Sequence, residues 1–313
     1  MPTAVVCRRV VALTAAALVA AVLVPVPAGA DTRCTYSAGE KLVRLWLMDD
    51  HIVQLYALDG KITYADLAWY HLKGQCGSAT VHNTDRVVVI AEEPGRSGLQ
   101  LRLALGRFGP GASAEDRGVS EIEIRIRGVR DLSLLGEGQQ RTITLGENGL
   151  NFNADRDADI RGLGSVQQVR VYLGDGDDTV SGAGGRGTGE AWDPPRRGYF
   201  SVSASDGNDT LLGSRGRDLL SGFLGRDRLE GYRGRDELYG DHHDDVIRGG
   251  RGDDILDGGS WSDDLYGGAG DDRLMADDET ADELFGGSGQ DYAGVDTHDT
   301  TAGVETVEVH PQP

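Results

Sequence analysis

The chain has 313 residues, and its 51 acidic side chains outnumber its 31 basic ones, which gives a formal net charge of −20. A chain this acidic is a poor nucleic-acid binder, because contacts to phosphate need a basic face. We therefore expect no nucleic-acid partner and instead a protein that binds cations.

The first 30 residues have the layout of a secretory signal peptide. Two arginines precede an apolar run over residues 10–24, and Ala28-Gly29-Ala30 supplies a small-residue cleavage site. The apolar run is shorter than the roughly 20 residues that a transmembrane helix needs. We predict cleavage after Ala30, by the general or the twin-arginine route. The mature protein is then secreted, extracellular or attached to the cell surface, with no membrane span.

Two cysteines, Cys34 and Cys76, remain after the predicted cleavage. An even number of cysteines in an exported protein indicates a disulfide. A metal site or a catalytic thiol is the alternative, but no cluster of histidines accompanies either residue in the sequence. The sequence therefore predicts a disulfide between Cys34 and Cys76.

The residues that follow the signal peptide are predicted as β structure. Residues 31–92 have the pattern of a small β unit, in which Asp59-Gly60 is a β-hairpin turn between two apolar runs. Residues 93–172 are predicted as a β-rich segment, because residues 121–127 alternate isoleucine with charged side chains. This segment is expected to lead into a solenoid over residues 173–294.

From residue 204 the chain repeats every nine residues as far as residue 294, and an isolated copy occupies residues 173–181. Residues 182–203, between these copies, are predicted as an insertion. Position six of each unit is an aspartate: Asp178, Asp209, Asp218, Asp227, Asp236, Asp245, Asp254, Asp263, Asp272, Asp282 and Asp291. Position eight is apolar: Val180, Leu211, Leu220, Leu229, Leu238, Ile247, Leu256, Leu265, Leu274, Leu284 and Ala293.

The residue types in this repeat suit calcium. Calcium takes six to eight oxygen ligands at about 2.3–2.6 Å. Glycines at positions one, two and four permit tight turns that aim backbone carbonyls inward, and the aspartate adds a carboxylate. We predict that several Ca²⁺ ions are held by the aspartates of position six and by the turn glycines Gly216, Gly234, Gly250, Gly252, Gly268, Gly270 and Gly289.

With these residues and this spacing, the chain resembles the haemolysin-type (RTX) calcium-binding repeat family over residues 173–181 and 204–294. The resemblance implies an all-β fold that ends in a right-handed parallel β-roll or β-helix. In the family, six residues of each unit make a turn and three make a strand, so two units complete a coil. Loops 18 residues apart then stack, and one ion between two loops shares both aspartates.

The repeats therefore divide between two edges of the predicted roll. The first edge has Asp218, Asp236, Asp254, Asp272 and Asp291, and position four of each of these units is glycine. The second edge has Asp209, Asp227, Asp245, Asp263 and Asp282, and its last three units have His243, Trp261 and Thr280 at position four. We predict that the first edge holds most of the calcium, with the Asp254/Asp272 site the best formed. Ala276, an extra residue, is expected to weaken the Asp272/Asp291 site.

Charge also couples calcium to folding. Residues 173–294 contain 28 acidic side chains and 12 arginines, a net of −16. Without cations these charges repel one another, and the apolar content is too small to offset the chain entropy. We expect calcium binding and folding of the repeats to be coupled.

No catalytic residue is predicted, because neither a zinc-binding H-E-x-x-H motif nor a G-x-S-x-G motif occurs. We expect a non-enzymatic, structural or adhesive protein whose partners, besides calcium, are an extracellular polysaccharide or a surface protein. The alternative is a secreted enzyme, for example a polysaccharide-modifying one, with its site in residues 31–172. Residues 295–313 are predicted as a tail that caps the last coil.

Overall fold

Strands make up nearly all the regular structure of the described residues. The computed structural model describes residues 33–47, 52–58, 61–66, 71–80, 86–91, 97–102, 123–136, 142–151, 160–185, 188–195 and 198–310. Residues 32–313 form a unit of their own, and the predicted signal peptide lies outside the described residues. In the described ranges, the one helical segment is the 3₁₀ turn η2, Leu163–Ser165, and no helix has the length and apolar content to cross a bilayer.

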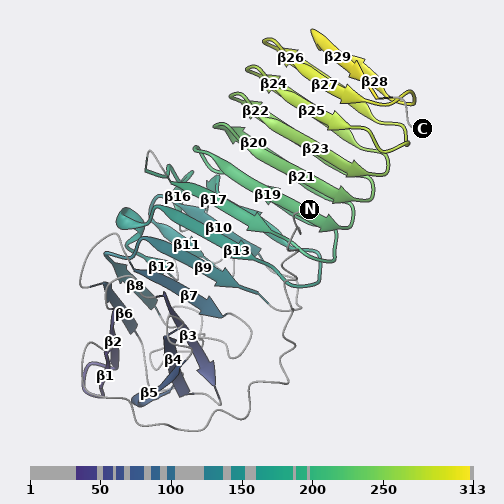
Figure 1. Ribbon diagram of the computed structural model, residues 1–313. Coiled ribbons are helices and arrows are strands. Elements are labelled where there is room, and N and C mark those ends of the chain that lie inside the picture. Colours follow the sequence, from purple (N-terminus) through teal and green to yellow (C-terminus); the bar gives the residue numbers. More distant parts are fainter. Residues whose placement is uncertain are drawn as a thin grey trace, which may run out of the picture. The chain divides into compact units, whose positions relative to one another are not determined.

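The strands belong to two long sheets that lie face to face (Figure 1). Within the described residues, sheet A has 14 strands, in this order: β1 (Arg33–Ser37), β2 (Leu42–Leu47), β6 (Arg86–Ala91), β8 (Glu123–Arg127), β12 (Ile160–Arg161), β11 (Gly149–Asn151), β10 (Thr142–Gly146), β14 (Thr179–Ser181), β18 (Thr210–Leu212), β20 (Arg228–Arg233), β22 (Val246–Arg251), β24 (Asp264–Ala269), β26 (Glu283–Ser288) and β28 (Thr300–Ala302).

Sheet B has 13 strands within the same described ranges, in this order: β29 (Thr306–Val309), β27 (Tyr292–Val295), β25 (Arg273–Ala276), β23 (Ile255–Ser260), β21 (Glu237–His242), β19 (Asp218–Leu224), β17 (Tyr199–Ser203), β13 (Gln168–Tyr172), β9 (Asp131–Leu135), β7 (Gly98–Arg102), β3 (Ile52–Leu58), β4 (Lys61–Asp66) and β5 (His71–Thr80). A short hairpin, β15 (Gly184–Gly185) with β16 (Gly189–Glu190), forms a separate two-stranded sheet. Backbone hydrogen bonds from Glu147 to Glu190 and from Asn148 to Thr188 join it to the β10–β11 turn of sheet A.

In the repeats the chain passes from one sheet to the other and back with each coil, and every strand pairs in parallel with the strand one coil on. Leu229 of β20, for example, is in register with Ile247 of β22, 18 residues later. All eleven apolar side chains of position eight are fully buried between the sheets. The predicted parallel β-roll is therefore confirmed, and the position-eight residues form its core.

The same two sheets continue through the residues that precede the repeats. In sheet A, Val43, Val87, Ile124 and Ile160 are in register on four successive strands, all of them buried. Ile124 and Ile126 point inward, as the alternation of residues 121–127 predicts. The segment boundaries expected at residues 92 and 172 stay predictions, and both sheets run across them.

The β-hairpin predicted around Asp59-Gly60 is present. Strands β3 and β4 form an antiparallel hairpin, although its Asp59-Gly60 turn lies outside the described residues. The β15–β16 hairpin lies within the predicted insertion, whose last residues, Tyr199–Ser203, are β17 of sheet B. At the other end of the chain, β28 and β29 pair with the last strands of the repeats, β26 and β27.

The predicted disulfide is also present, and it joins the N-terminal ends of the two sheets. Cys34 lies on β1, at the end of sheet A, and Cys76 lies on β5, at the end of sheet B. The Cα atoms of the two cysteines are 5.2 Å apart, and Cys76 is fully buried. The bond therefore closes the end of the solenoid that lies farthest from the repeats.

We expect replacement of both cysteines by serine to lower the free energy of unfolding by about 4 kcal/mol, because the bond closes a loop across 42 residues of chain. Urea unfolding in saturating calcium, followed by fluorescence, measures the change. The free energy of unfolding should be high for the oxidised wild type. It should be lower, and similar, for the reduced wild type and the double serine variant. Equal values for all three proteins would contradict this role.

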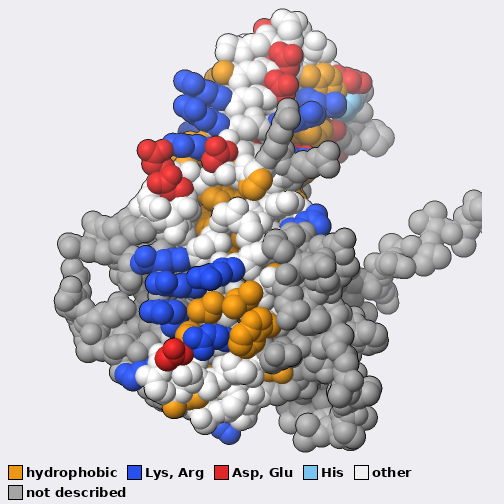
Figure 2. Space-filling view, turned by 90° about the vertical axis from the view of Figure 1, so that its left-hand side faces the viewer, with side chains coloured by type: hydrophobic (Ala, Val, Ile, Leu, Met, Phe, Trp, Pro, Cys, Tyr) orange, Lys and Arg blue, Asp and Glu red, His pale blue; other side chains and the backbone are white. Residues whose placement is uncertain are grey.

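Charge is distributed unevenly along the solenoid. Residues 31–172 contain 19 acidic and 17 basic side chains, a net of −2, whereas residues 173–294 have a net of −16. Figure 2 shows Lys and Arg side chains gathered in a column in the lower part of the view, with hydrophobic side chains beside them. The acidity of the protein is thus concentrated in the repeats.

Candidate metal centre

The aspartates of position six form two buried columns, one along each edge of the roll. Each side chain lies under its turn, and the backbone N–H of one aspartate donates a hydrogen bond to Oδ1 of the aspartate one coil on. On the first edge the bonds join Asp218 to Asp236 at 2.9 Å, Asp236 to Asp254 at 2.8 Å, Asp254 to Asp272 at 2.9 Å and Asp272 to Asp291 at 2.9 Å.

The second edge has the same arrangement. Its bonds join Asp178 to Asp209 at 2.6 Å, Asp209 to Asp227 at 2.7 Å, Asp227 to Asp245 at 2.7 Å, Asp245 to Asp263 at 2.8 Å and Asp263 to Asp282 at 2.7 Å. The structure therefore brings the predicted aspartates together in the predicted pairs, with spacings of one coil.

Two residues that the sequence analysis missed complete the columns at the C-terminal end. The N–H of Asp291 donates to Glu305 at 2.8 Å, and the N–H of Asp282 donates to Asp299 at 3.0 Å. These carboxylates follow the aspartates by 14 and 17 residues, so the nine-residue period does not predict them. Their position in the predicted capping tail was the only available signal.

The second carboxylate oxygen of most of these aspartates is buried without a partner. Among the described residues, Oδ2 has no hydrogen-bond donor in Asp209, Asp227, Asp236, Asp245, Asp254, Asp272, Asp282 and Asp291. A buried carboxylate oxygen without a donor or a cation is costly, because it has lost its water and gained nothing in return. The columns therefore present repeated oxygen ligands that a cation would satisfy.

The glycine at position one lets these oxygens approach the backbone. A Cβ built on Gly249 would lie 2.6 Å from Oδ2 of Asp254 and 2.8 Å from the carbonyl oxygen of Gly267, one coil on. A side chain at this position would therefore occupy the space into which a carboxylate oxygen and a carbonyl oxygen both face. This pair of oxygens fits the hard, oxygen-rich coordination of calcium.

Backbone carbonyl oxygens must supply many of the ligands of any metal ion bound along the aspartate columns. In the described part of the chain, no group of three His, Cys, Asp or Glu side chains is arranged to hold a metal ion. Such clusters are typical of zinc and other transition-metal sites. A site built from one or two carboxylates and several carbonyl oxygens instead favours calcium, as the turn glycines predict.

Burial raises the pKa of nine of these carboxyl groups, those of position six from Asp209 to Asp282, above the ordinary value of 3.8. The pKa is raised to about 9 for Asp236, by burial and then by the charges of Asp218 and Asp254. It is raised to about 8 for Asp245 and Asp263 and to about 6 for Asp254, with burial the main cause in each. Without a cation, these aspartates therefore stay protonated to a higher pH in the folded repeats than in the unfolded chain.

These shifts predict that the calcium-free fold is most stable in acid. Between 3.8 and the raised values, the folded chain binds more protons than the unfolded chain, so the free energy of unfolding falls as pH rises. In calcium-free buffer, the urea midpoint should be higher at pH 5 than at pH 8, as urea titrations at both pH values would show. A midpoint that rises with pH without calcium would contradict the prediction.

At the N-terminal end of the first edge, hydrogen bonds within the protein already satisfy the carboxylate of Asp218. Ser214 donates to both carboxylate oxygens of Asp218, from its N–H at 2.6 Å and from its Oγ at 2.7 Å. Gly216 in the same turn packs against Pro194, which lies 2.3 Å from the position of a Cβ, and does not have a positive φ. Asp218 and Gly216 therefore have less to offer calcium than their counterparts farther along the column.

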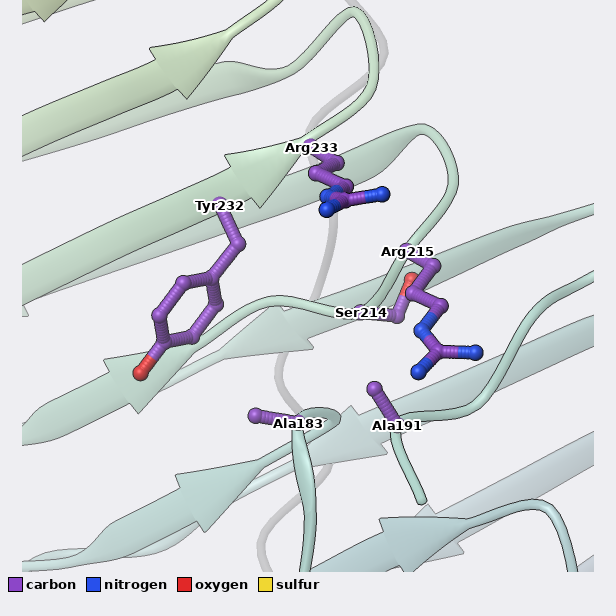
Figure 3. A pocket seen from close by; sticks show the side chains of 6 residues that line it. All are labelled: Ala183, Ala191, Ser214, Arg215, Tyr232 and Arg233. Carbon is purple, nitrogen blue, oxygen red and sulfur yellow. The ribbon is translucent and has the colours of Figure 1, made fainter.

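A cavity of about 220 Å³ lies beside this end of the first edge (Figure 3). Its lining residues are Ala183, Ala191, Ser214, Arg215, Tyr232 and Arg233. In Figure 3 the guanidinium groups of Arg215 and Arg233 lie on one side and the ring of Tyr232 on the other. Arg215 is ion-paired with Glu190 at 2.6 Å. The guanidinium group of Arg233, which lines the same cavity, repels a cation, which again favours calcium binding at the later units.

The middle of the first edge keeps the geometry expected for calcium. Gly250, Gly252, Gly268 and Gly270 have positive φ values between 110° and 138°, and Gly234 and Gly289 have 141° and 149°. Position five is Asp253 in the unit of Asp254 and Asp271 in the unit of Asp272, and Asp253 accepts a hydrogen bond from the N–H of Asp271 at 3.1 Å. The Asp254/Asp272 pair therefore combines regular turns with additional negative charge.

Ala276 does not disrupt the first column. The N–H of Asp272 reaches Asp291 at 2.9 Å, the same distance as between Asp254 and Asp272, although 19 residues separate the pair. Ala276 is the last residue of β25 and pairs with Val295, so the extra residue is accommodated in the second-edge turn that follows. The reason given for a weaker Asp272/Asp291 site is therefore wrong.

The turns of the second edge keep their shape, but the backbone is strained where glycine is missing at position four. His243 and Trp261, at position four, have φ values of 77° and 91°, which residues other than glycine rarely adopt. Their rings stack with centroids 5.4 Å apart. Each such residue costs about 1–3 kcal/mol. These turns therefore keep their backbone geometry without glycine, although His243 and Trp261 are strained. The absence of glycine at position four suggests instead that the turn geometry is lost.

Arg217 and Arg226, which are at position five of their units, pair with acidic side chains of the next coil. Arg226 contacts Asp244 at 2.8 Å, and Arg217 contacts Glu237 at 2.5 Å. Both pairs are solvent-exposed, so each contributes little to stability. They place positive charge beside the earlier units and leave the Asp254/Asp272 pair without a basic neighbour at position five.

Comparison with known proteins agrees with this geometry. A family model that describes four copies of the RTX calcium-binding nonapeptide repeat matches residues 168–188, 203–238, 221–256, 239–274 and 257–293. Searches of the curated proteins and of the solved structures give no significant match.

Proposed function

Because residues 168–188 and 203–293 of this chain are RTX calcium-binding nonapeptide repeats, we propose that the protein is a secreted, non-enzymatic calcium-binding protein with a structural or adhesive role. The column of buried Oδ2 atoms supports this proposal most strongly. A folded state with so many uncompensated carboxylates is unfavourable at neutral pH unless cations accompany it.

In this proposal the repeats serve as a calcium-dependent scaffold at the cell surface or in the extracellular matrix. Calcium, when bound, supplies the positive charge that the buried carboxylates lack. Asp236, Asp254, Asp272 and Asp291 are the first ligands that we assign, with carbonyl oxygens of the turns around them. Extracellular calcium modules bind at about 10⁻⁴–10⁻³ M, so the repeats would stay unfolded inside the cell and fold after export.

The secreted location rests on the sequence of residues 1–30, and the non-enzymatic role rests on the absence of recognisable catalytic motifs. We propose an extracellular polysaccharide or a surface protein as the partner. Such a role suits a long, rigid solenoid, because stacked coils present a continuous surface along their length.

Expression of the whole chain in a secreting host, followed by fractionation, tests this function. We expect protein that starts at Asp31 in the surface and medium fractions, and release of the surface fraction by a calcium chelator. Retention inside the cell with residues 1–30 intact would contradict secretion. Turnover of a polysaccharide by the purified protein would contradict the non-enzymatic role and favour the alternative of an enzyme.

A further inference from the structure

The cavity beside the first edge is built from two stacked turns and from the insertion between the repeats. Its lining consists of two adjacent residues from each turn and two alanines from the insertion: Ser214 and Arg215, Tyr232 and Arg233, Ala183 and Ala191. A Cβ on Gly234 would lie 2.1 Å from the carbonyl oxygen of Gly216, so the two turns are in direct contact. The lining residues therefore come from three segments that only the folded solenoid brings together.

The wall that the insertion contributes is held in place. Trp192, next to Ala191, is buried, and its ring packs edge-on against Phe200 with the ring centroids 6.5 Å apart. The carbonyl oxygen of Trp192 accepts a hydrogen bond from the N–H of Arg215 at 2.9 Å, and its N–H donates to the carbonyl oxygen of Gly182 at 3.0 Å. Because the wall is already ordered, a ligand that enters the cavity has little ordering of the protein to overcome.

The cavity has one positive charge that no acidic side chain compensates. Arg215 is ion-paired with Glu190 at 2.6 Å, so the net charge of that pair is zero. Arg233 is exposed, and its guanidinium group has no ion pair or hydrogen bond in the described part of the chain. Arg251, in register with it on the next coil, is also exposed and is likewise unpaired among the described residues. Like charges in register destabilise a sheet, so folding alone does not favour the arginine at residue 233.

Tyr232 adds a flat apolar surface on the side of the cavity opposite the guanidinium groups (Figure 3). The residue is 40% exposed and has a φ of 68°, which residues other than glycine rarely adopt. The residue in register with it one coil on is Gly250, so the roll accepts glycine at this place. Strained residues of this kind cluster at ligand-binding and active sites. A strained, exposed aromatic ring that lines a cavity therefore indicates a ligand.

We propose that this cavity binds a monocarboxylate that carries an apolar ring. The guanidinium group of Arg233 matches one carboxylate, which it can bind through two parallel N–H···O bonds. The ring of Tyr232 and the methyl groups of the two alanines suit the apolar part of the ligand. An apolar cavity of about 150 Å³ can bind benzene. The cavity volume of about 220 Å³ therefore has room for a ring with a short acid group.

A sugar or a phosphate fits this cavity less well. Ser214 donates to Asp218 from both its N–H and its Oγ, and its Oγ accepts the N–H of Gly216 at 3.2 Å, so it offers little to the hydroxyl groups of a sugar. A dianion would bring a second negative charge that Arg233 alone cannot compensate, next to repeats with a net charge of −16. The chemistry is that of a small aromatic acid, or of the free C-terminus of a peptide that ends in an aromatic residue.

This inference goes beyond the proposed scaffold function and rests on it in one respect, the calcium-driven folding of the repeats. The two turns that line the cavity lead into Asp218 and Asp236 of the first column, so the site should assemble only when calcium folds the repeats. Binding of the carboxylate should therefore require calcium, although none of the lining residues is among the calcium ligands that we assign.

Titration of the whole protein with phenylacetate, followed by ligand-detected NMR in calcium at about 10⁻³ M, tests the inference. The variant Arg233→Gln removes the uncompensated charge. Arg235→Gln is the matched control, because Arg235 is exposed and belongs to the same turn but does not line the cavity. The variant Tyr232→Gly removes the ring and also relieves the strain of the positive φ.

We expect wild-type protein to bind phenylacetate with a Kd on the order of 10⁻³ M and more weakly as salt increases. Arg233→Gln should weaken binding at least about fivefold, and Arg235→Gln by no more than about twofold. Tyr232→Gly should weaken binding at least about threefold without lowering the urea midpoint in calcium, a combination that a purely structural role of the ring would not produce. Equal affinities of Arg233→Gln and Arg235→Gln would overturn the inference.

Further probes test the chemistry of the ligand and its source. Benzyl alcohol lacks the carboxylate, acetate lacks the ring, glucuronate has a sugar ring, and sulfate is a dianion. Each should bind more weakly than phenylacetate, and tighter binding of any of them would overturn the proposed chemistry. A tripeptide that ends in phenylalanine is compared with its C-terminal amide; tighter binding of the free acid than of phenylacetate would identify a chain terminus as the source, and equal binding of acid and amide would contradict a carboxylate site.

Circular dichroism of the same samples separates this inference from the proposed function, because it reports calcium-driven folding. A wild-type protein that folds with calcium but does not bind phenylacetate refutes this inference alone. Binding that is equally strong in calcium and in chelator, with an unchanged spectrum, supports the site and refutes calcium-driven folding.

Discussion

Replacement of Gly252 by alanine is expected to destabilise the calcium-bound repeats by at least about 3 kcal/mol. Gly252 has a φ of 131°, and a Cβ there would lie 1.4 Å from the carbonyl oxygen of Gly234 in the preceding coil. The backbones of stacked coils touch at this point, so no side-chain rearrangement relieves the clash. Because each coil is stabilised by its neighbours, separation of two coils weakens the whole stack.

Gly164→Ala is the matched control for this substitution. Gly164 lies in the turn η2, and nothing is within 4 Å of the position of its Cβ. Its replacement should change the free energy of unfolding by no more than about 0.5 kcal/mol. Urea unfolding of both variants in saturating calcium measures the difference. Equal midpoints for the two variants would show that the close contact between coils does not exist.

Replacement of Asp254 by asparagine is expected to weaken calcium binding by about tenfold or more, because the charge of the ligands sets the affinity of such sites. Asparagine keeps an oxygen that can accept the N–H of Asp236, which donates to Oδ1 of Asp254 at 2.8 Å. It removes the charge that Oδ2 carries without a hydrogen-bond donor among the described residues. The substitution therefore separates the structural role of Asp254 from its role as a ligand.

The same substitution should have the opposite effect without calcium. At pH 8 the buried carboxyl of Asp254, whose pKa is raised to about 6, is charged in the folded chain, and asparagine removes that cost. The variant should then be more stable than wild type without calcium and gain less from added calcium. Calorimetric titration and urea unfolding measure the two effects.

Asp264→Asn is the control for the second prediction, since Asp264 lies at position seven on β24 of sheet A and is only half-buried. It should leave both the calcium affinity and the calcium-free stability near those of wild type. If Asp254→Asn and Asp264→Asn gave the same calcium affinity, Asp254 would not be a ligand.

The repeats could be predicted closely because their period of nine residues is nearly constant from residue 204 to residue 294. Nine residues per unit place every aspartate of position six at an edge and every apolar residue of position eight in the core, and both sets lie there. The coils before the repeats have the same two-sheet architecture, but their sequence does not show it. Val43, Val87, Ile124 and Ile160 are in register in sheet A, yet 44, 37 and 36 residues separate them. Coils of unequal length leave no period in the sequence.

The local chemistry of single turns was also beyond prediction. The sequence shows that His243 and Trp261 replace glycine, but only the structure shows that they keep positive φ with their rings stacked. Ser214 occupies both carboxylate oxygens of Asp218, a contact that depends on the backbone path of its turn. Asp299 and Glu305 complete the columns from outside the period. Each case depends on a three-dimensional contact that spacing does not encode.

Calcium-driven folding is the central claim, and hydrogen–deuterium exchange of the whole protein at pH 8 tests it most directly. The amides of residues 203–294 are compared in calcium at about 10⁻³ M, in magnesium at the same concentration and in chelator. We predict slow exchange in calcium alone, while the disulfide-closed coils around Val43 and Val87 stay protected in all three. Equal protection of residues 203–294 in calcium and in chelator would contradict the claim.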